Sequence, residues 1–438
     1  MEKKVINQEN KSGFSALIPF FVFLFFYLGL SILAKDFYCV PMTVAFLVAS
    51  AAAFLQNKRE KFSEKVEFFA HGMGENNIMI MCLIFILAGA FAAIAKATGS
   101  VDAAVRLSRH AIPDSLILPE FFLISCFISL AIGTSCGTIA ALIPIAIGMI
   151  DVMNISPALM FGSVIGGAMF GDNMSMISDT TIAATRTQNV AMRDKFIMNF
   201  KMVLPAAIIC IVIYLFCGFN EAKGVELAPT SWKDVILIIP YLFILIGALL
   251  GMNVIALLFS GTCVSFLIGI TIGGMDFWKS LGIVGSGTLS MAETLIVAIL
   301  AGGLLNLIRI NGGIAYLMQK IESGVKGQKG CEFGIMLLVG AVNLFTANNT
   351  VAIVVAGPIA KELSRKYNCD PRRIASILDA SSCVVQGLIP YGAQILIAVG
   401  LAQNANLQIS SLGLIGALYY PMLLALALLA SIFFRKQK

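Results

Sequence analysis

The stretch that decides the fold is Gly171-Asp172-Asn173-Met174-Ser175-Met176-Ile177-Ser178-Asp179-Thr180-Thr181, which lies between apolar segments. It places two carboxylates, an amide and several hydroxyls within an otherwise apolar part of the sequence. A charge at the centre of a bilayer costs about 2.5–3.5 kcal/mol on insertion scales. The stretch is therefore either a polar loop outside the membrane or a broken membrane helix whose unwound middle holds an ion.

The composition around this stretch is that of a membrane protein. Of the 438 residues, 59% are hydrophobic and 12% charged, against about 25% charged in a soluble domain. Apolar runs long enough to cross a bilayer recur from end to end. The net charge of +6 lies in short loops and indicates topology rather than a nucleic-acid partner. We therefore expect an all-α polytopic membrane protein.

The scarcity of catalytic side chains excludes most enzyme classes. The ten cysteines show neither CxxC nor zinc-site spacing, and there are two histidines in the whole chain. A histidine-dependent triad or a histidine-rich metal site is thus nearly excluded. We expect no enzyme activity and no cofactor. The apolar run 14–33 is too long for a signal peptide and is expected to be the first spanning helix.

Outward from the opening stretch, apolar segments divide the chain into two similar halves. The first half predicts helices at 14–34, 40–56, 76–97, 117–150 (interrupted at 133–138), 157–190 (interrupted at the opening stretch) and 196–219. The second half predicts helices at 234–251, 253–272, 290–308, 332–360 (broken), 371–402 and 411–434.

An internal repeat relates these halves. Pro144 and Pro157 match Pro358 and Pro371, and one constant offset with no gap relates both pairs. The predicted organisation is a cytoplasmic tail (1–13), a first repeat (14–219), a linker (220–233), a second repeat (234–434) and a second cytoplasmic tail (435–438).

The basic loops fix the expected orientation. They fall at 58–65, 186–195, 320–329, 361–373 and 435–438. They share the cytoplasmic side if each half has five spanning helices and one re-entrant hairpin. This predicts about ten transmembrane helices plus two re-entrant hairpins, arranged as inverted five-helix repeats with discontinuous helices, an arrangement typical of secondary transporters.

The interruptions supply the candidate site residues. Broken helices free backbone carbonyls, which together with carboxylate and hydroxyl oxygens can bind sodium. The candidates for binding an ion or proton are Asp172, Asp179, Ser178, Thr180, Asn173, Ser175, Thr134, Ser135 and Thr138, with Asp172 and Asp179 as the sodium carboxylates. The candidates for binding a substrate are Asn348, Asn349, Thr350, Asp379, Ser381, Ser382, Gln386 and Gln394.

Structural alternatives stay open for the neutral candidates. Residues 134–135 and 348–349 could make only interhelical hydrogen bonds. The glycine-rich segment 162–167 could be a close-packing face or a hinge.

Structural alternatives also stay open for the acids. Asp172 and Asp179 could be paired with Arg186 or Arg193. Asp379 could only cap an unwound segment.

At this point the motifs resemble a known family. Residues 171–181 are similar to the GDxxSPxSDTT signature of the NhaC-type sodium/proton antiporters, with Met176 where the family has proline. The resemblance covers about 14–434. It implies two re-entrant hairpins, two broken helices, a scaffold domain, a mobile transport domain and a homodimer. Residues 386–394 depart from the acidic segment and LIPWN pattern of characterised antiporters.

Two functions follow as hypotheses. The first is sodium/proton antiport in the inner (cytoplasmic) membrane, in which carboxylates bind Na⁺ or H⁺ in competition during alternating access. The second is a sodium- or proton-coupled carrier or exchanger of a small organic solute, such as an amino acid or carboxylate. The amide-rich second half supports the second hypothesis.

Overall fold

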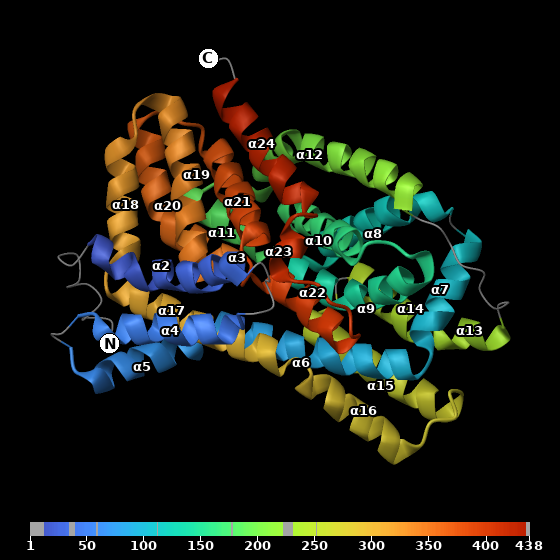
Figure 1. Cartoon of the computed structure of the whole chain (residues 1–438). Helices are drawn as coiled ribbons and strands as arrows, with labels where there is room; N and C mark the ends of the chain where they lie inside the picture. The colour runs from blue at the N-terminus through green and yellow to red at the C-terminus, as the bar shows by residue number, and fades with distance from the viewer. Residues whose placement is uncertain are drawn as a thin grey trace.

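The computed structural model describes residues 13–34, 40–57, 60–111, 113–176, 178–221, 231–250 and 252–434. Within these ranges the chain forms helices and no strands (Figure 1). The all-α prediction is confirmed. Most of the predicted tails and of the 220–233 linker lies outside the described residues.

The helices predicted in the first half are present in the predicted order, together with two that were not predicted, at 62–73 and 100–111. Residues 14–34 form a helical run with a π-helical turn at Phe25–Gly29. After it come α4 (Met42–Leu55), α5 (Phe62–Met73), α6 (Asn76–Ala97), α7 (Ser100–Ala111), α8 (Ile117–Ile132), α9 (Ser135–Met153), α10 (Pro157–Met174), α11 (Asp179–Gln188) and α12 (Met192–Glu221).

The second half has the same order. It comprises α13 (Trp232–Leu237), α14 (Ile239–Leu249), α15 (Val254–Thr271), α16 (Phe277–Leu289), α17 (Ala292–Ile310), α18 (Gly313–Gly324), α19 (Gly327–Thr346), α20 (Asn349–Lys366), α21 (Pro371–Leu388), α22 (Ala393–Asn404), α23 (Ser411–Ile415) and α24 (Tyr419–Phe433). Pro157 and Pro371 open α10 and α21 at the first helical position, where a missing N–H costs nothing.

The basic loop expected at 58–65 is wrong in its second part. Helix α5 begins at Phe62 and contains Lys65. The buried ammonium of Lys65 donates to the carbonyl of Phe54, at 2.8 Å, and to that of Gln56. These carbonyls end α4 and lack helical partners, so the lysine satisfies them. The charge thus stabilises a helix end instead of marking a loop.

Six helical segments of the described chain are long and apolar enough to cross a membrane. They are Ile78–Ala97, Met192–Phe219, Val254–Thr271, Phe277–Ile310, Gly327–Thr346 and Pro371–Asn404. Five shorter apolar helices accompany them. The chain is therefore a multi-pass membrane protein, and the arrangement of ten spanning helices with two hairpins stays a prediction.

Glycines set the closest helix contacts. A Cβ added at Gly167 would lie 2.1 Å from the carbonyl oxygen of Phe122, and one at Gly171 would lie 2.3 Å from that of Cys126. Helix α10 therefore packs with its backbone directly against α8. Of the two interpretations of 162–167, this contact supports close packing, and it fixes the helix that carries Asp172.

Helices of the two halves also pack on one another reciprocally. Helix α5 packs on α17, and α6 packs on α16, with Gly72 against Gly302 and Gly89 against Gly287. In Figure 1, α4, α5, α6 and α17 lie below α19, α20 and α21. The elements with the candidate residues thus rest on a layer to which both halves contribute.

Candidate functional site

The helix interruptions expected from the sequence are all present. A residue in the left-handed conformation caps the C-terminus of each of two helices: Gly133 (φ 76°) follows α8, and Ala347 (φ 46°) follows α19. Extended residues follow at once: Thr134 (φ −151°, ψ 126°) and Asn348 (φ −145°, ψ 116°). These residues are related by the same offset as the paired prolines, so the sequence repeat corresponds to a repeated backbone conformation.

The other two breaks correspond in the same way. Helix α10 gives way to α11 between Ser175 and Ser178, and α21 gives way to α22 between Ile389 and Gly392. Helix α11 packs on α20, while α22 packs on α9. Each half-helix therefore lies against the helix that follows a break in the other half.

Asp172 is the carboxylate at the meeting point of these breaks. Its side chain is buried near the end of α10. Its Oδ2 accepts from the hydroxyl of Ser135 at 2.8 Å and from the backbone N–H of Ser135 at 3.3 Å. Its Oδ1 accepts from the hydroxyl of Ser178, which lies 2.9 Å from that of Thr180. Ser135 opens α9, so the carboxylate sits at a helix N-terminus, where negative charge is stabilised.

Two glutamines extend this group into the second half. The Nε2 of Gln394 donates to the hydroxyl of Ser135 at 3.1 Å. The Nε2 of Gln386 donates to Oε1 of Gln394 at 3.2 Å and to the carbonyl of Ala347 at 3.0 Å. A single hydrogen-bonded chain thus touches all four breaks. We call Asp172, Ser135, Ser178, Thr180, Gln386 and Gln394 the Asp172 cluster.

The charge in this cluster is asymmetric between the halves. In the second half, Gln386 lies at the same offset from Asp172 as Pro371 from Pro157, and Ala393 lies at that offset from Asp179. The first half thus contributes the carboxylate, while the second contributes neutral amides. Gln386 is buried, and its Oε1 has no hydrogen-bond partner in the part of the chain that the structure describes.

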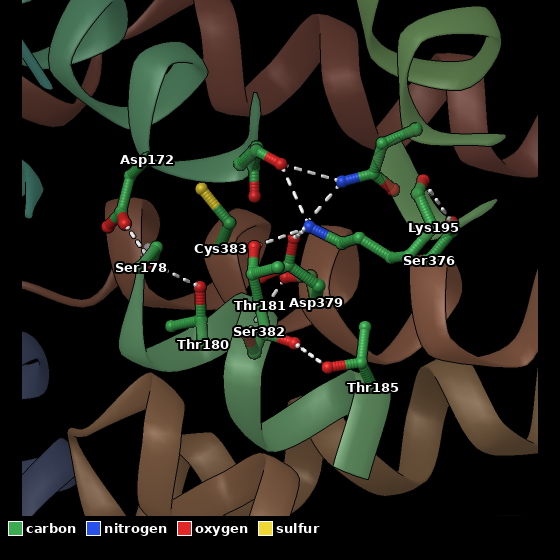
Figure 2. A network of polar contacts seen from close by, with 12 residues as sticks. Asp172, Ser178, Thr180, Thr181, Thr185, Lys195, Ser376, Asp379, Ser382 and Cys383 are labelled. Carbon is green, nitrogen blue, oxygen red and sulfur yellow. Dashed lines mark hydrogen bonds and ion pairs between the residues drawn. The ribbon is translucent and has the colours of Figure 1, made fainter. Parts of the chain in front are cut away.

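Lys195 holds a second buried group beside the first. Its Nζ donates to Oδ2 of Asp379 at 2.5 Å, to the hydroxyl of Thr181 at 2.7 Å and to the carbonyl of Asn173 at 2.9 Å. Asn199 donates from Nδ2 to the same carbonyl, at 2.8 Å, and to the same carboxylate oxygen, at 3.1 Å. We call these five residues the Lys195 cluster. In Figure 2, Cys383 lies between this group and the Asp172–Ser178–Thr180 group.

The sequence prediction missed Lys195 and Asn199. The 186–195 segment was expected to be a basic loop, but α12 begins at Met192 and buries Lys195, which is 1% exposed. The available signal was spacing, because residues four apart share one helix face. A lysine four positions before an asparagine at the start of an apolar helix marks a polar face there.

Asp379 is therefore not a cap for an unwound segment. It lies inside α21 and pairs with Lys195.

Asp179 lies apart from both clusters. It is exposed on the first turn of α11, and none of the hydrogen bonds of the Asp172 cluster reaches it. Among the described residues, the salt bridges include neither Asp172 nor Asp179, so pairing with Arg186 or Arg193 is wrong.

The remaining candidates make local contacts around the breaks. Asn173 donates to the hydroxyl of Tyr420 at 3.1 Å, and Ser175 donates to the carbonyl of Leu130 at 2.9 Å. Thr138 donates to the carbonyl of Thr134 at 3.0 Å, and Ser382 to the carbonyl of Asp379 at 2.9 Å. Asn348 accepts from the N–H of Val351 at 3.0 Å, and Asn349 accepts from Asn343 at 3.0 Å. Ser381 is buried with an unpartnered hydroxyl, while Thr350 and Thr134 are partly buried. Asn348 and Thr138 thus stabilise helix ends.

Comparison with known sequences identifies the family. A sequence model described as the Na+/H+ antiporter family matches residues 13–219 and 225–433, which is nearly the whole chain. The chain belongs to the Na+/H+ antiporter family.

The names of similar curated proteins differ in the substrates that they state. The chain is 23% identical over 410 residues to the malate-2H(+)/Na(+)-lactate antiporter of Bacillus subtilis, covering 86% of each chain. It is 24% identical over 388 residues to the Na(+)/H(+) antiporter NhaC of the same organism, covering 81% of this chain and 84% of that one. It is 21% identical over 352 residues to the arginine/ornithine antiporter ArcD of Halobacterium salinarum, covering 73% and 72%. The chain is thus a secondary antiporter and not an enzyme.

Proposed function

We propose that this antiporter exchanges sodium for protons across the cell membrane, with Asp172 as the shared binding group. The observation that carries the proposal is the position of Asp172. It is a buried carboxylate that accepts hydrogen bonds from hydroxyls beyond two different helix breaks: Ser135 at the start of α9 and Ser178, which caps α11. Carboxylate and hydroxyl oxygens are the ligands that hard cations prefer.

The hydroxyls around Asp172 can interact with the site both when it holds sodium and when it holds a proton. A hydroxyl is one donor and an acceptor with two lone pairs. Ser135 and Ser178 donate to the carboxylate in the present arrangement. When sodium is bound, the same oxygens can rotate their hydrogens away and serve as ligands. When a proton is bound, they accept from or donate to the carboxylic acid.

Burial of the carboxylate accounts for obligatory exchange. An uncompensated charge inside the membrane is costly. The site therefore changes sides readily with either Na⁺ or H⁺ bound and slowly when empty. Because one carboxylate cannot hold both ions, each sodium moved one way is exchanged for protons moved the other way.

The proposal includes an architecture for this movement. The two halves are inverted repeats that alternate access to the site, with both termini cytoplasmic and the protein forming a homodimer. The matching φ and ψ angles at the breaks and the reciprocal packing of α11 on α20 and α22 on α9 support the repeat. Cysteines introduced at positions 225 and 437 would then react with impermeant reagents from opposite sides of the membrane, and reaction from one side would contradict this topology.

The exchange is tested in proteoliposomes with an internal pH dye and a sodium pulse. Wild-type protein should show sodium-dependent proton flux, and Asp172→Asn should abolish it. Asp276→Asn, an exposed helix cap on α16, serves as the matched charge control and should retain flux. A folded wild-type protein without sodium-dependent flux would refute the proposal.

The same assay assigns Asp179. It remains a proposed sodium ligand, but its exposure on α11 places it outside the cluster. Asp179→Asn should therefore reduce the apparent affinity for sodium while flux at saturating sodium persists. Loss of all flux would place Asp179 with Asp172.

A second candidate function is exchange of a small organic solute. The amide of Gln394 contacts Ser135, which binds the carboxylate, and the amide of Gln386 contacts Gln394. Among the described residues, Oε1 of Gln386 has no partner. Such groups bind carboxylates or amines without titrating. Relatives named for malate and lactate and for arginine and ornithine favour this alternative. Thermal stabilisation by one of these four solutes, lost in Gln386→Ala, would support it, and no shift with any of them would count against it.

A further inference from the structure

The oxygens around the Lys195 ammonium come from three different helices. Asp379 supplies a carboxylate oxygen from α21, Thr181 a hydroxyl from the first turn of α11, and Asn173 a backbone carbonyl from the end of α10. All three lie within 2.9 Å of Nζ. The lysine side chain itself comes from α12, outside both broken helices.

This set of oxygens has the chemistry of a cation site. Hard cations in proteins take carboxylate, carbonyl and uncharged oxygen ligands. The carbonyl of Asn173 is available because α10 stops at Met174 and leaves its last carbonyls without helical partners. The partial negative charge of a helix C-terminus points at the same place.

The site also has acceptor capacity that the lysine does not use. Among the described residues, Oδ1 of Asp379 and Oδ1 of Asn199 are both buried and have no hydrogen-bond partner. A buried carboxylate oxygen without a partner is unusual, because such groups are costly to leave unsatisfied. The cluster thus has more oxygen ligands than the ammonium's three protons can engage.

We propose that the Lys195 cluster is a second monovalent-cation site whose occupant is the protein's own lysine. The tethered ammonium takes the place of a free cation. It neutralises Asp379 permanently, so this carboxylate carries no exchangeable ion, and it joins both sides of the α10–α11 break to α21. The inference does not depend on which ions Asp172 exchanges.

The consequence is that removal of the ammonium should open the site to a free cation. Lys195→Met removes the charge and keeps most of the side-chain volume. The measurement is the thermal unfolding midpoint of purified full-length protein in sodium, potassium or choline chloride at equal ionic strength. Choline is too large for the cage and is the reference. The variants are made in an Asp172→Asn background, so that cation binding at Asp172 does not contribute.

We expect no cation-dependent shift in Asp172→Asn alone. In Asp172→Asn/Lys195→Met, saturating sodium or potassium should raise the midpoint by about 3–6 °C over choline. The larger of the two shifts identifies the cation that fits. Adding Asp379→Asn should remove the shift, because the carboxylate is then gone.

Three results would overturn the inference. One is a folded Asp172→Asn/Lys195→Met protein that responds equally to all three salts. Another is a shift that persists after Asp379→Asn. A third is failure of the Asp172→Asn/Lys195→Met variant to fold in sodium and potassium as well as in choline, since a cage that admits either cation would be refilled. Wild-type sodium dependence, measured separately, tests the role of Asp172, so the two proposals fail independently.

Discussion

The Lys195–Asp379 pair gives the sharpest energetic prediction. Both side chains are 1% exposed, and the lysine makes three hydrogen bonds. Removing one partner of a buried ion pair leaves an uncompensated charge and costs about 3–5 kcal/mol, whereas replacing both partners is often nearly neutral. Lys195→Met and Asp379→Asn should therefore each destabilise strongly, and the double variant should be more stable than either single one.

The magnitude follows from the contacts that each variant leaves. After Lys195→Met, Asp379 retains the amide of Asn199 as its described donor, at 3.1 Å. After both substitutions no charge remains in the Lys195 cluster, and the losses are the hydrogen bonds to Thr181 and to the carbonyl of Asn173. Since Asn199 still donates to that carbonyl, we expect a cost of about 1–2 kcal/mol for the double variant. The non-additivity, which is the sum of the two single costs minus the cost of the double variant, is then at least about 4 kcal/mol.

The assay is equilibrium unfolding in mixed detergent micelles, carried out in choline chloride so that no small cation enters the site. Arg372→Met with Asp370→Asn is the matched control, because the Arg372 side chain is 55% exposed and that of Asp370 26%, against 1% for each partner of the Lys195–Asp379 pair. An exposed pair contributes about 0–1 kcal/mol. Strictly additive effects at Lys195 and Asp379 would refute the assignment of a tight buried pair.

Three further predictions concern packing, backbone strain and pH. Gly167→Ala places a methyl group 2.1 Å from a backbone carbonyl oxygen of α8 and should destabilise the protein by about 1–3 kcal/mol or more. Gly282→Ala, where the added methyl group meets open space, should be neutral or slightly stabilising. Equal effects of the two variants in thermal unfolding would contradict the close packing of α10 on α8. Ala347→Gly should raise stability by about 1 kcal/mol, because φ of 46° is costly for a residue with a Cβ; an unchanged or lower midpoint would argue against that strain. The Arg106 guanidinium holds the pKa of the Asp234 carboxyl below its usual value of 3.8. The stability advantage of wild type over Asp234→Asn should therefore be fully present above the usual pKa and disappear as pH falls through the lower folded-state pKa. A stability advantage that grows in acid would contradict this prediction.

The broken helices were predictable from the sequence because their signals are local. Proline opens α10 and α21, and polar or small residues fill each interruption within a few positions. The two proline pairs, Pro144 with Pro358 and Pro157 with Pro371, define the offset at which the breaks of the two halves correspond. The cluster around Asp172 followed from the same local signals, since Ser135, Ser178 and Gln394 all lie at helix starts beside a break.

Other features depend on tertiary contacts that no local pattern records. Lys195 has the sequence context of a loop cation, and only the approach of α21 reveals its partner. Asp179 shares a motif with Asp172, but the extended residues between α10 and α11 separate their side chains. Helix α16 escaped prediction because its glycines weaken the helical pattern, although Gly287 makes a close contact with α6.

The bond between Gln394 and Ser135 has a consequence for biosynthesis. The two residues are 259 positions apart. At translation rates of about 5–20 residues per second, roughly 10–50 s pass between the emergence of the serine and that of the glutamine. During this interval Asp172 is already in the membrane without the amide chain of the second half. The Asp172 cluster is therefore completed late in synthesis, and a ribosome that stalls before α22 leaves a chain in which Asp172 and Ser135 lack the amides of Gln386 and Gln394.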